Sequence, residues 1–204
     1  FQFGPALAPD RIREAYQSPS ANFTAEDGTD LNLHDGWQDA GNLNVDGYLD
    51  IEDGIAECLG RGERVLSLGG DHSITYPIMR AYARQYPKLT ILQFDAHPDL
   101  YDVLDDNRHS HACPFARIME NGLAQRLIQV GIRTLTAHQR EQARRFDVEI
   151  VAMRDWTPSV ELTFDGPLYV SLDLDVLDPA FAPGVSHHEP GGFSTRELIN
   201  MLQR

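Results

Sequence analysis

Two patterns of apolar residues alternate along the chain, one typical of buried strands and one typical of helices. Short continuous runs rich in Val, Ile, Leu and Phe are typical of strands that are buried on both faces of a parallel sheet. We expect such strands at 30–34, 64–68, 89–94, 126–131, 149–153 and 168–173. Segments of helical period lie between them, at 9–16, 47–59, 75–86, 114–120, 137–146 and from Ser194, whose spacing from Glu197 is that of a capping box. This alternation predicts an α/β fold with right-handed crossovers.

Three polar clusters each follow one of the predicted strands. They read Gly-Gly-Asp-His-Ser at 69–73, Phe-Asp-Ala-His-Pro-Asp at 94–99 and Ser-Leu-Asp-Leu-Asp at 171–175. Alternate residues of an extended chain point to the same side, so Asp95, His97 and Asp99 can face one point. Functional residues of open α/β sheets gather outside the carboxyl ends of the strands, which is where all three clusters fall.

Together the clusters supply a set of ligands for metal ions. The set is His72, Asp95, His97, Asp99, Asp173 and Asp175. Four carboxylates and two imidazoles at one place repel one another unless cations lie between them. Hard oxygen ligands with imidazole nitrogen suit Mn²⁺ and do not support a thiolate-rich zinc site. Each cluster alone also fits an ordinary turn or helix cap, and it is their coincidence that favours a two-metal hydrolytic site.

Charge and composition narrow the class of partner. The chain has 31 acidic and 17 basic residues, for a net charge of −14, which argues against nucleic acid and anionic membranes as partners. No apolar run is long enough to span a bilayer. Two isolated cysteines, Cys58 and Cys113, do not form a disulfide framework, so we expect a cytoplasmic protein. An organellar presequence stays an open alternative, because the chain does not begin with Met.

Further histidines follow the clusters. Hydrolysis that expels an amine needs a proton donor, and histidine is the usual one near neutral pH. His109 and His111 both follow Asp99, and either could instead be a surface loop residue. The Pro/Gly-rich segment 177–184 predicts a rigid loop beside the site, and His187 and His188 then offer polar groups at its rim for substrate binding. Ordinary polarity of an exposed loop explains these two histidines equally well.

The three clusters resemble the motifs of the ureohydrolase family, which includes agmatinase, arginase and formimidoylglutamase. Segments 110–120 and 183–192 resemble the agmatinase-like and plant-type arginase branch. The resemblance covers nearly the whole chain. It implies a three-layer αβα sandwich on a parallel sheet and a binuclear manganese hydrolase that cleaves a guanidino group.

The resemblance also implies a role for each candidate residue. The terminal ligands of one Mn²⁺ would be His72 and Asp99, those of the other His97 and Asp175, and the bridging ligands Asp95 and Asp173. Asp99 would in addition accept a hydrogen bond from the attacking hydroxide. His111 matches the family histidine that relays protons near the leaving group, whereas His109 has no counterpart.

The expected substrate is agmatine, a small cationic guanidino compound, which would be cleaved to putrescine and urea. This preference follows the branch resemblance, and no site for the α-carboxylate of arginine can be identified. Three alternatives remain: an arginase, a related single-zinc deacetylase, and a truncated fragment that binds metal but is inactive.

The resemblance further implies how the chain is organised. We expect residues 1–204 to form a single domain that lacks the N-terminal strand of the family and its C-terminal strand and helix. The full-length protein would be a homo-oligomer, a trimer or a hexamer, as is common in the family.

Overall fold

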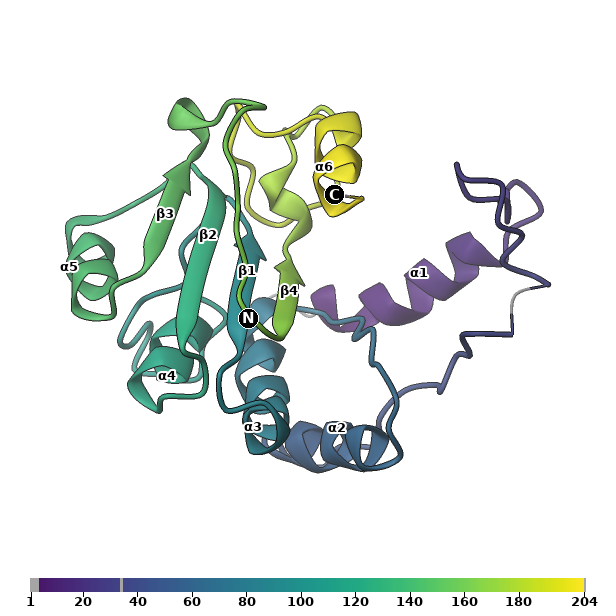
Figure 1. Ribbon diagram of the computed structural model, residues 1–204, viewed down its shortest axis with the longest axis horizontal. Helices are drawn as coiled ribbons and strands as arrows, with labels where there is room; N and C mark the ends of the chain where they lie inside the picture. Colours follow the sequence, from purple (N-terminus) through teal and green to yellow (C-terminus); the bar gives the residue numbers. More distant parts are fainter. Residues whose placement is uncertain (1–3, 34, 204) are drawn as a thin grey trace.

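A parallel sheet of four strands forms the centre of the molecule (Figure 1). The computed structural model describes residues 4–33 and 35–203. The strands are β1 (Thr90–Phe94), β2 (Arg126–Ile132), β3 (Glu149–Ala152) and β4 (Leu168–Leu172), in the spatial order β3-β2-β1-β4. Each neighbouring pair is parallel. The sheet thus brings the carboxyl ends of β1 and β4 side by side.

Helices cover both faces of the sheet. On one face α3 (Thr75–Gln85), α4 (Pro114–Glu120) and α5 (Ala137–Arg145) pack against a cluster that includes Ile91 and Leu127. On the other face α6 (Thr195–Leu202) covers Leu92 and Phe94. α2 (Asp50–Gly60) lies outside α3 and packs on it. The layers are therefore helix, sheet and helix, which confirms the predicted α/β sandwich.

Two helices begin where their caps require. Ser194 accepts from the backbone N–H of Glu197, and the Glu197 side chain accepts from the backbone of Ser194, as the sequence predicts for α6. Thr136 and Gln139 form the same capping box at α5. Both boxes satisfy donors that the first turn of a helix leaves free.

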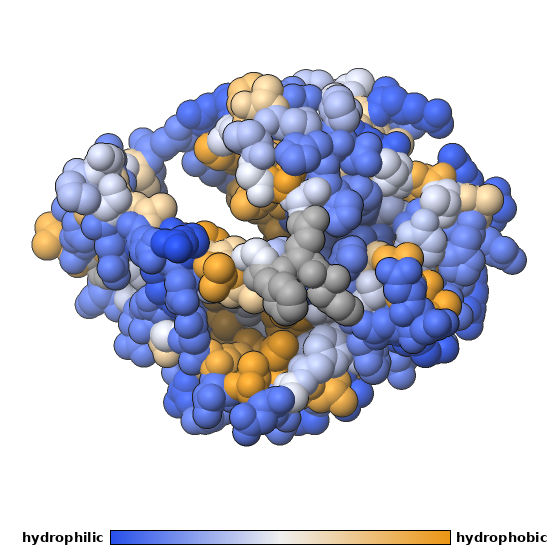
Figure 2. Space-filling model, turned by 180° about the vertical axis from the view of Figure 1, so that it is seen from behind, coloured by the Kyte–Doolittle hydropathy of each residue, from blue (hydrophilic) through white to orange (hydrophobic). Residues whose placement is uncertain are grey.

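One helix lies apart from the sandwich. α1 (Ala8–Tyr16) projects beyond β4, and the chain that follows it returns to α2 along an extended path (Figure 1). Seen from behind, exposed apolar side chains gather around a hollow (Figure 2). Leu66, Val170 and Leu172 are among the exposed apolar residues of the described chain. No helix of the described residues is both long and apolar enough to cross a membrane.

Two of the predicted strands are wrong. Segment 64–68 is extended but pairs with no strand among the described residues; Val65 packs beside α2 and α3, and Leu66 is 85% exposed. Segment 30–34 is a turn over its described residues, because Asp30 bridges back to Thr24 and its carboxylate accepts from the N–H of Asn32. The last residue of that segment, His34, lies outside the described residues.

Candidate metal centre

The candidate ligands lie at the carboxyl ends of β1 and β4 and at the start of α3. Asp95 follows β1 and Asp173 follows β4, and the N–H of Asp173 donates to the carbonyl of Phe94 at 2.9 Å. His72 opens the 3₁₀ turn His72–Ile74, which leads directly into α3. Three separate segments of the chain thus meet at one edge of the sheet, where parallel strands of open α/β sheets carry their sites.

His72 faces three carboxylates. Its Nδ1 lies 3.0 Å from Asp95 Oδ2, 3.1 Å from Asp99 Oδ2 and 3.5 Å from Asp173 Oδ2. His72, Asp95 and Asp99 together could hold one metal ion, because their ligand atoms all lie within 4.8 Å of one another. Asp99 adopts a left-handed backbone conformation with φ of 49°. A non-glycine residue rarely adopts this conformation, and strain of this kind tends to occur at functional sites.

His97 belongs to a second group that shares one carboxylate with the first. Its Nδ1 lies 3.0 Å from Asp175 Oδ2 and 3.6 Å from Asp95 Oδ1. Asp95, His97 and Asp175 could hold a second metal ion. Asp95 turns one oxygen toward each imidazole, which is the arrangement of a bridging ligand. Asp173 is outside both groups, and its Oδ1 accepts from the N–H of Asp175 at 2.9 Å.

The surroundings of His72 fit a metal ligand. Its Nε2 lies 2.8 Å from Ser171 Oγ, and a proton donated there leaves a lone pair on Nδ1. The buried Nδ1 makes no hydrogen bond of normal geometry with any residue that the structure describes, although three carboxylate oxygens are close to it. A lone pair aimed at anionic oxygens is unfavourable unless a cation lies between them. The donor set and this orphaned nitrogen therefore both fit divalent metal ions.

Without cations the cluster holds protons in their place. Burial and the charge of Asp95 raise the pKa of Asp99 to about 7 and that of Asp173 to about 6. Burial alone would lower the pKa of His97, but Asp175 and Asp95 together raise it to about 11. Bound protons thus offset part of the excess negative charge, and a metal ion has to displace them.

Two of the remaining histidines lie beside the cluster. The ring of His187 stacks on that of His111, with centroids 5.7 Å apart, and lies edge-on to that of His97 at the same distance. Burial lowers the pKa of His111, the charge of Asp71 opposes this shift, and the charges of His187 and other histidines add to it, so that the pKa is lowered overall. His111 is therefore mainly neutral near neutral pH.

The other two histidines singled out in the sequence, His109 and His188, belong to neither ligand group. His109 stacks between the rings of Tyr48 and Tyr76. Exposed His188 lies with Nε2 3.1 Å from the carbonyl oxygen of Pro183.

The residues that hold the candidate ligands in place through hydrogen bonds were not identified from the sequence. Arg133 donates to the carbonyls of Asp175, Val176 and Leu177, and so holds the turn that carries Asp175. Gln93 donates to Asp95 Oδ2 at 2.7 Å. A signal for Gln93 was present, because it is a polar residue inside an apolar run that predicts a strand buried on both faces.

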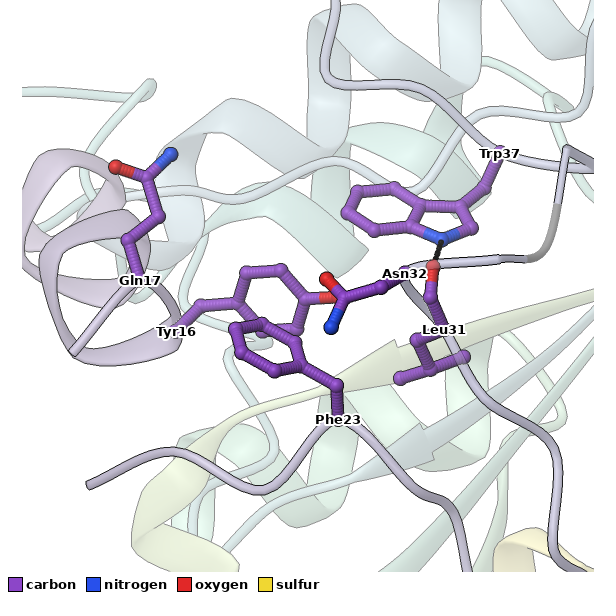
Figure 3. A pocket seen from close by; sticks show the side chains of 6 residues that line it. All are labelled: Tyr16, Gln17, Phe23, Leu31, Asn32 and Trp37. Atoms are coloured by element: carbon purple, nitrogen blue, oxygen red, sulfur yellow. Dashed lines mark hydrogen bonds between the residues drawn. The ribbon is translucent and has the colours of Figure 1, made fainter. Parts of the chain in front are cut away.

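A separate cavity of about 500 Å³ lies between α1 and the segment that follows it. Its wall is aromatic: Tyr16 meets Phe23 edge-on at 5.0 Å and Trp37 at 5.5 Å between centroids (Figure 3). Trp37 Nε1 donates to the carbonyl of Leu31. None of the candidate ligands lines this cavity, so it is distinct from the metal centre.

The fold and the two groups with a shared carboxylate define a class of α/β protein with a candidate binuclear metal centre. The model of the arginase family matches residues 1–204, and the chain belongs to this family. This confirms the resemblance seen in the sequence.

Three similar proteins cover much of the chain. A protein named arginase 1, mitochondrial, from Oryza sativa subsp. indica is 44% identical over 99% of this chain and 65% of its own length. The structure of the arginase from Medicago truncatula has a TM-score of 0.91 at 42% identity and covers 100% of this chain and 70% of that one. A protein named agmatinase from Bacillus anthracis is 33% identical over 74% of this chain and 53% of its own length. The chain thus spans about two thirds of the length of the rice relative.

Proposed function

We propose that this chain carries the metal centre of an arginase, which hydrolyses the guanidino group of arginine to ornithine and urea with two Mn²⁺ ions. The observation that carries the proposal is the pair of ligand groups that share Asp95. Each group combines one imidazole with two carboxylates, a donor set that suits Mn²⁺. Bound as a pair, such ions activate a water molecule as a nucleophile at neutral pH.

The expectation of agmatine as substrate is not confirmed, and the alternative of an arginase has better support. The rice arginase is 44% identical over 99% of the chain, whereas the Bacillus agmatinase is 33% identical over 74%. The match to the arginase thus extends over the parts of the chain that the match to the agmatinase leaves out. We therefore place arginine first and keep agmatine as the competing substrate.

The protein residues would divide the work as follows. Asp95, with an oxygen toward each imidazole, would bridge the ions, and Asp173, 3.5 Å from His72, is proposed as the second bridge. Asp99 is proposed to accept a hydrogen bond from the attacking nucleophile. The surrounding carboxylates attract a cationic guanidinium group.

His111 is proposed as the proton relay. Its neutral imidazole can accept a proton at the site and pass it to the departing amine nitrogen. The ring contacts of His187 with His111 and His97 support our proposal that His187 binds substrate. The same role for His188, which lies against Pro183, stays a prediction.

Urea release tests the proposal. The chain is loaded with Mn²⁺ and offered arginine or agmatine separately, and Asp175→Asn is the matched inactive control. Urea from arginine, absent in the control, supports the arginase. Urea from agmatine alone returns the assignment to an agmatinase, and no urea from either substrate contradicts a competent hydrolase in this chain.

Compartment and assembly stay predictions. The name of the rice relative places that protein in mitochondria, so the expected cytoplasmic location is not confirmed. Cell fractionation would test it. Light scattering of the full-length protein would test the expected trimer or hexamer.

A further inference from the structure

Two glutamines lie in the middle of the sheet with no exposed surface. Gln93 on β1 and Gln129 on β2 are partners in the register of the parallel pair, and both are 0% exposed. Each is two residues from an apolar side chain of the same face, Ile91 and Leu127 respectively, which belong to the cluster under α3 and α4. Amides buried in an apolar layer are costly unless they are hydrogen-bonded, so the bonds of this pair need an explanation.

The four N–H donors of the pair all have acceptors. Gln129 Nε2 lies 2.6 Å from both Gln93 Oε1 and the carbonyl oxygen of Pro98. Gln93 Nε2 lies 2.7 Å from Asp95 Oδ2 and 3.1 Å from the carbonyl oxygen of His97. A carboxylate and a carbonyl can only accept, and this determines which end of each amide faces them. The pair is thus a chain of donors directed at residues 95–98.

These bonds restrain the loop that carries three candidate ligands. The bond from Gln93 holds the carboxylate of Asp95 in the orientation that turns one oxygen toward each imidazole. The bond from Gln129 to the carbonyl of Pro98 holds the peptide between Pro98 and Asp99, immediately before Asp99 with its left-handed backbone conformation. Gln129 Oε1 accepts no hydrogen bond from any described residue, so the amide group at position 129 keeps one buried acceptor unpaired. An apolar side chain of equal length would fill the same space without that penalty.

We propose that Gln93 and Gln129 are positioning residues of the metal centre, which orient Asp95 and Asp99 for the binding of two divalent cations. The inference rests on the proposed function, because it takes these carboxylates to be metal ligands. Beyond the bond between the two glutamines, their amides donate to the carboxylate of Asp95 and to the backbone carbonyls of His97 and Pro98. Their effect passes through hydrogen bonds to the ligand loop, as partners behind metal ligands generally act.

The test compares Gln93→Met and Gln129→Met with a control on the same face of the sheet. Methionine keeps the length of glutamine and removes the N–H donors. The control is Leu127→Ala, which opens a cavity in the adjacent apolar cluster, and none of the candidate ligands belongs to that cluster. The two readouts are the Mn²⁺ dissociation constant from calorimetry and the melting temperature of the metal-free chain.

The expected result separates affinity from stability. Gln93→Met weakens Mn²⁺ binding by about 10- to 100-fold, and Gln129→Met weakens it less, because its effect on Asp95 passes through Gln93. The double variant loses less than the product of the two single losses, as expected for one connected chain. Leu127→Ala lowers the melting temperature of the metal-free chain at least as much as the methionine variants do. Its Mn²⁺ affinity nevertheless stays within about twofold of that of the unsubstituted chain.

Two results would overturn the inference. One is Mn²⁺ affinity in both methionine variants equal to that of the unsubstituted chain. The other is a loss of affinity in Leu127→Ala of the same size, which reduces the glutamines to a general structural role. In the first case the proposed function stands, because the unsubstituted chain still binds Mn²⁺ and its urea release is measured separately. If the unsubstituted chain binds no Mn²⁺, both the proposed function and this inference fail.

Discussion

Asp95 is the residue on which both ligand groups depend. It is 1% exposed, and its oxygens face His72 on one side and His97 on the other. Asp175 belongs to one group only. Their substitutions therefore have different consequences for metal binding.

We expect Asp95→Asn to weaken binding of both Mn²⁺ ions, and Asp175→Asn to weaken mainly one. Asparagine keeps the shape of the side chain but removes the charge that attracts the cations. Calorimetric titration with Mn²⁺ measures this as the loss of both binding steps in the first variant and of one step in the second. Retention of two full steps in Asp95→Asn would contradict a shared ligand.

The pKa values of the same residues predict how metal binding depends on pH. At pH 6 the pKa values of Asp99, about 7, and His97, about 11, leave both mainly protonated, and Asp173, at about 6, is half protonated. A metal ion binds the deprotonated ligands, so its binding releases protons and its affinity rises with pH. We expect Mn²⁺ affinity to increase steadily between pH 5.5 and about 7.5.

Titration in buffers of different ionisation enthalpy measures the released protons directly. The number released per Mn²⁺ should fall as the pH rises and Asp173 and Asp99 lose their protons. Asp99→Asn is the control. It has no titrating proton at this position, so it should release fewer protons per Mn²⁺. A proton count of zero at pH 6 would disagree with the raised pKa values.

The ligand residues could be predicted from the sequence because their spacing is local. Asp95 and His97 are two positions apart in the segment that directly follows β1, and each cluster follows an apolar run. Gln93 and Gln129 could not be predicted as a pair, since they are 36 positions apart and meet only through the register of β1 and β2. Such contacts depend on strand order, which the sequence pattern does not contain.

The turn after β4 is the element that carries Asp175. This short 3₁₀ turn, Leu174–Val176, has three carbonyls in or beside it that accept from the guanidinium of Arg133 on the strand-end segment after β2. Gly131 adopts φ of +95°, and a Cβ there would lie 2.6 Å from Val176 Cγ2. The two segments therefore approach closely because residue 131 is a glycine, and the half-buried guanidinium of Arg133 links them through hydrogen bonds to the carbonyls.

Arg133→Met should loosen this turn. Loss of the guanidinium removes the donor to the carbonyls of Asp175 and Leu177, whereas the carbonyl of Val176 keeps the N–H of Phe193. A buried carbonyl left without a donor costs about 1–3 kcal/mol. We expect a lower free energy of unfolding, by about 2–4 kcal/mol, together with weaker binding of the Mn²⁺ held by Asp175.

Urea denaturation and Mn²⁺ titration measure the two effects of Arg133→Met. The control is Arg126→Met on β2, whose exposed ion pair with Glu149 should contribute about 1 kcal/mol or less. Equal effects of both substitutions on Mn²⁺ affinity would argue against a role for Arg133 in holding the turn.

Helices and strands were predicted well where nearby residues determine them, and poorly where pairing with a distant strand determines them. Residues 114–120 were predicted as a helix and form α4, because Pro114 suits the first turn and Asn121-Gly122 ends it. Segment 64–68 has the apolar composition of a strand but no neighbouring strand to pair with among the described residues. A strand exists only with a partner, and the pattern of one segment cannot supply it.

For the molecule as a whole, the exposed apolar edge at β4 bears on how chains associate with one another. β4 pairs with β1 on one side, and no described strand pairs with its other side. Its residues Leu168, Val170 and Leu172 are each about 40% exposed. An unpaired strand with apolar side chains promotes association between chains.

Leu168→Lys should therefore reduce concentration-dependent self-association of this chain. A lysine charge on an edge strand opposes pairing with another edge. The control is Leu49→Lys, which changes a leucine of similar exposure just before α2. Sedimentation velocity over a range of concentrations should show less association in Leu168→Lys than in the control; equal association in the two would contradict the role of the edge.

The central claim is that the chain binds two metal ions through two ligand groups that share Asp95. Crystals grown with Mn²⁺ and measured near the manganese absorption edge would test it most directly. The account predicts two anomalous peaks about 3.5–4 Å apart, the usual spacing of two-metal sites. One should lie among His72, Asp95 and Asp99, and the other among Asp95, His97 and Asp175. A single peak, or no peak at these residues, would contradict it.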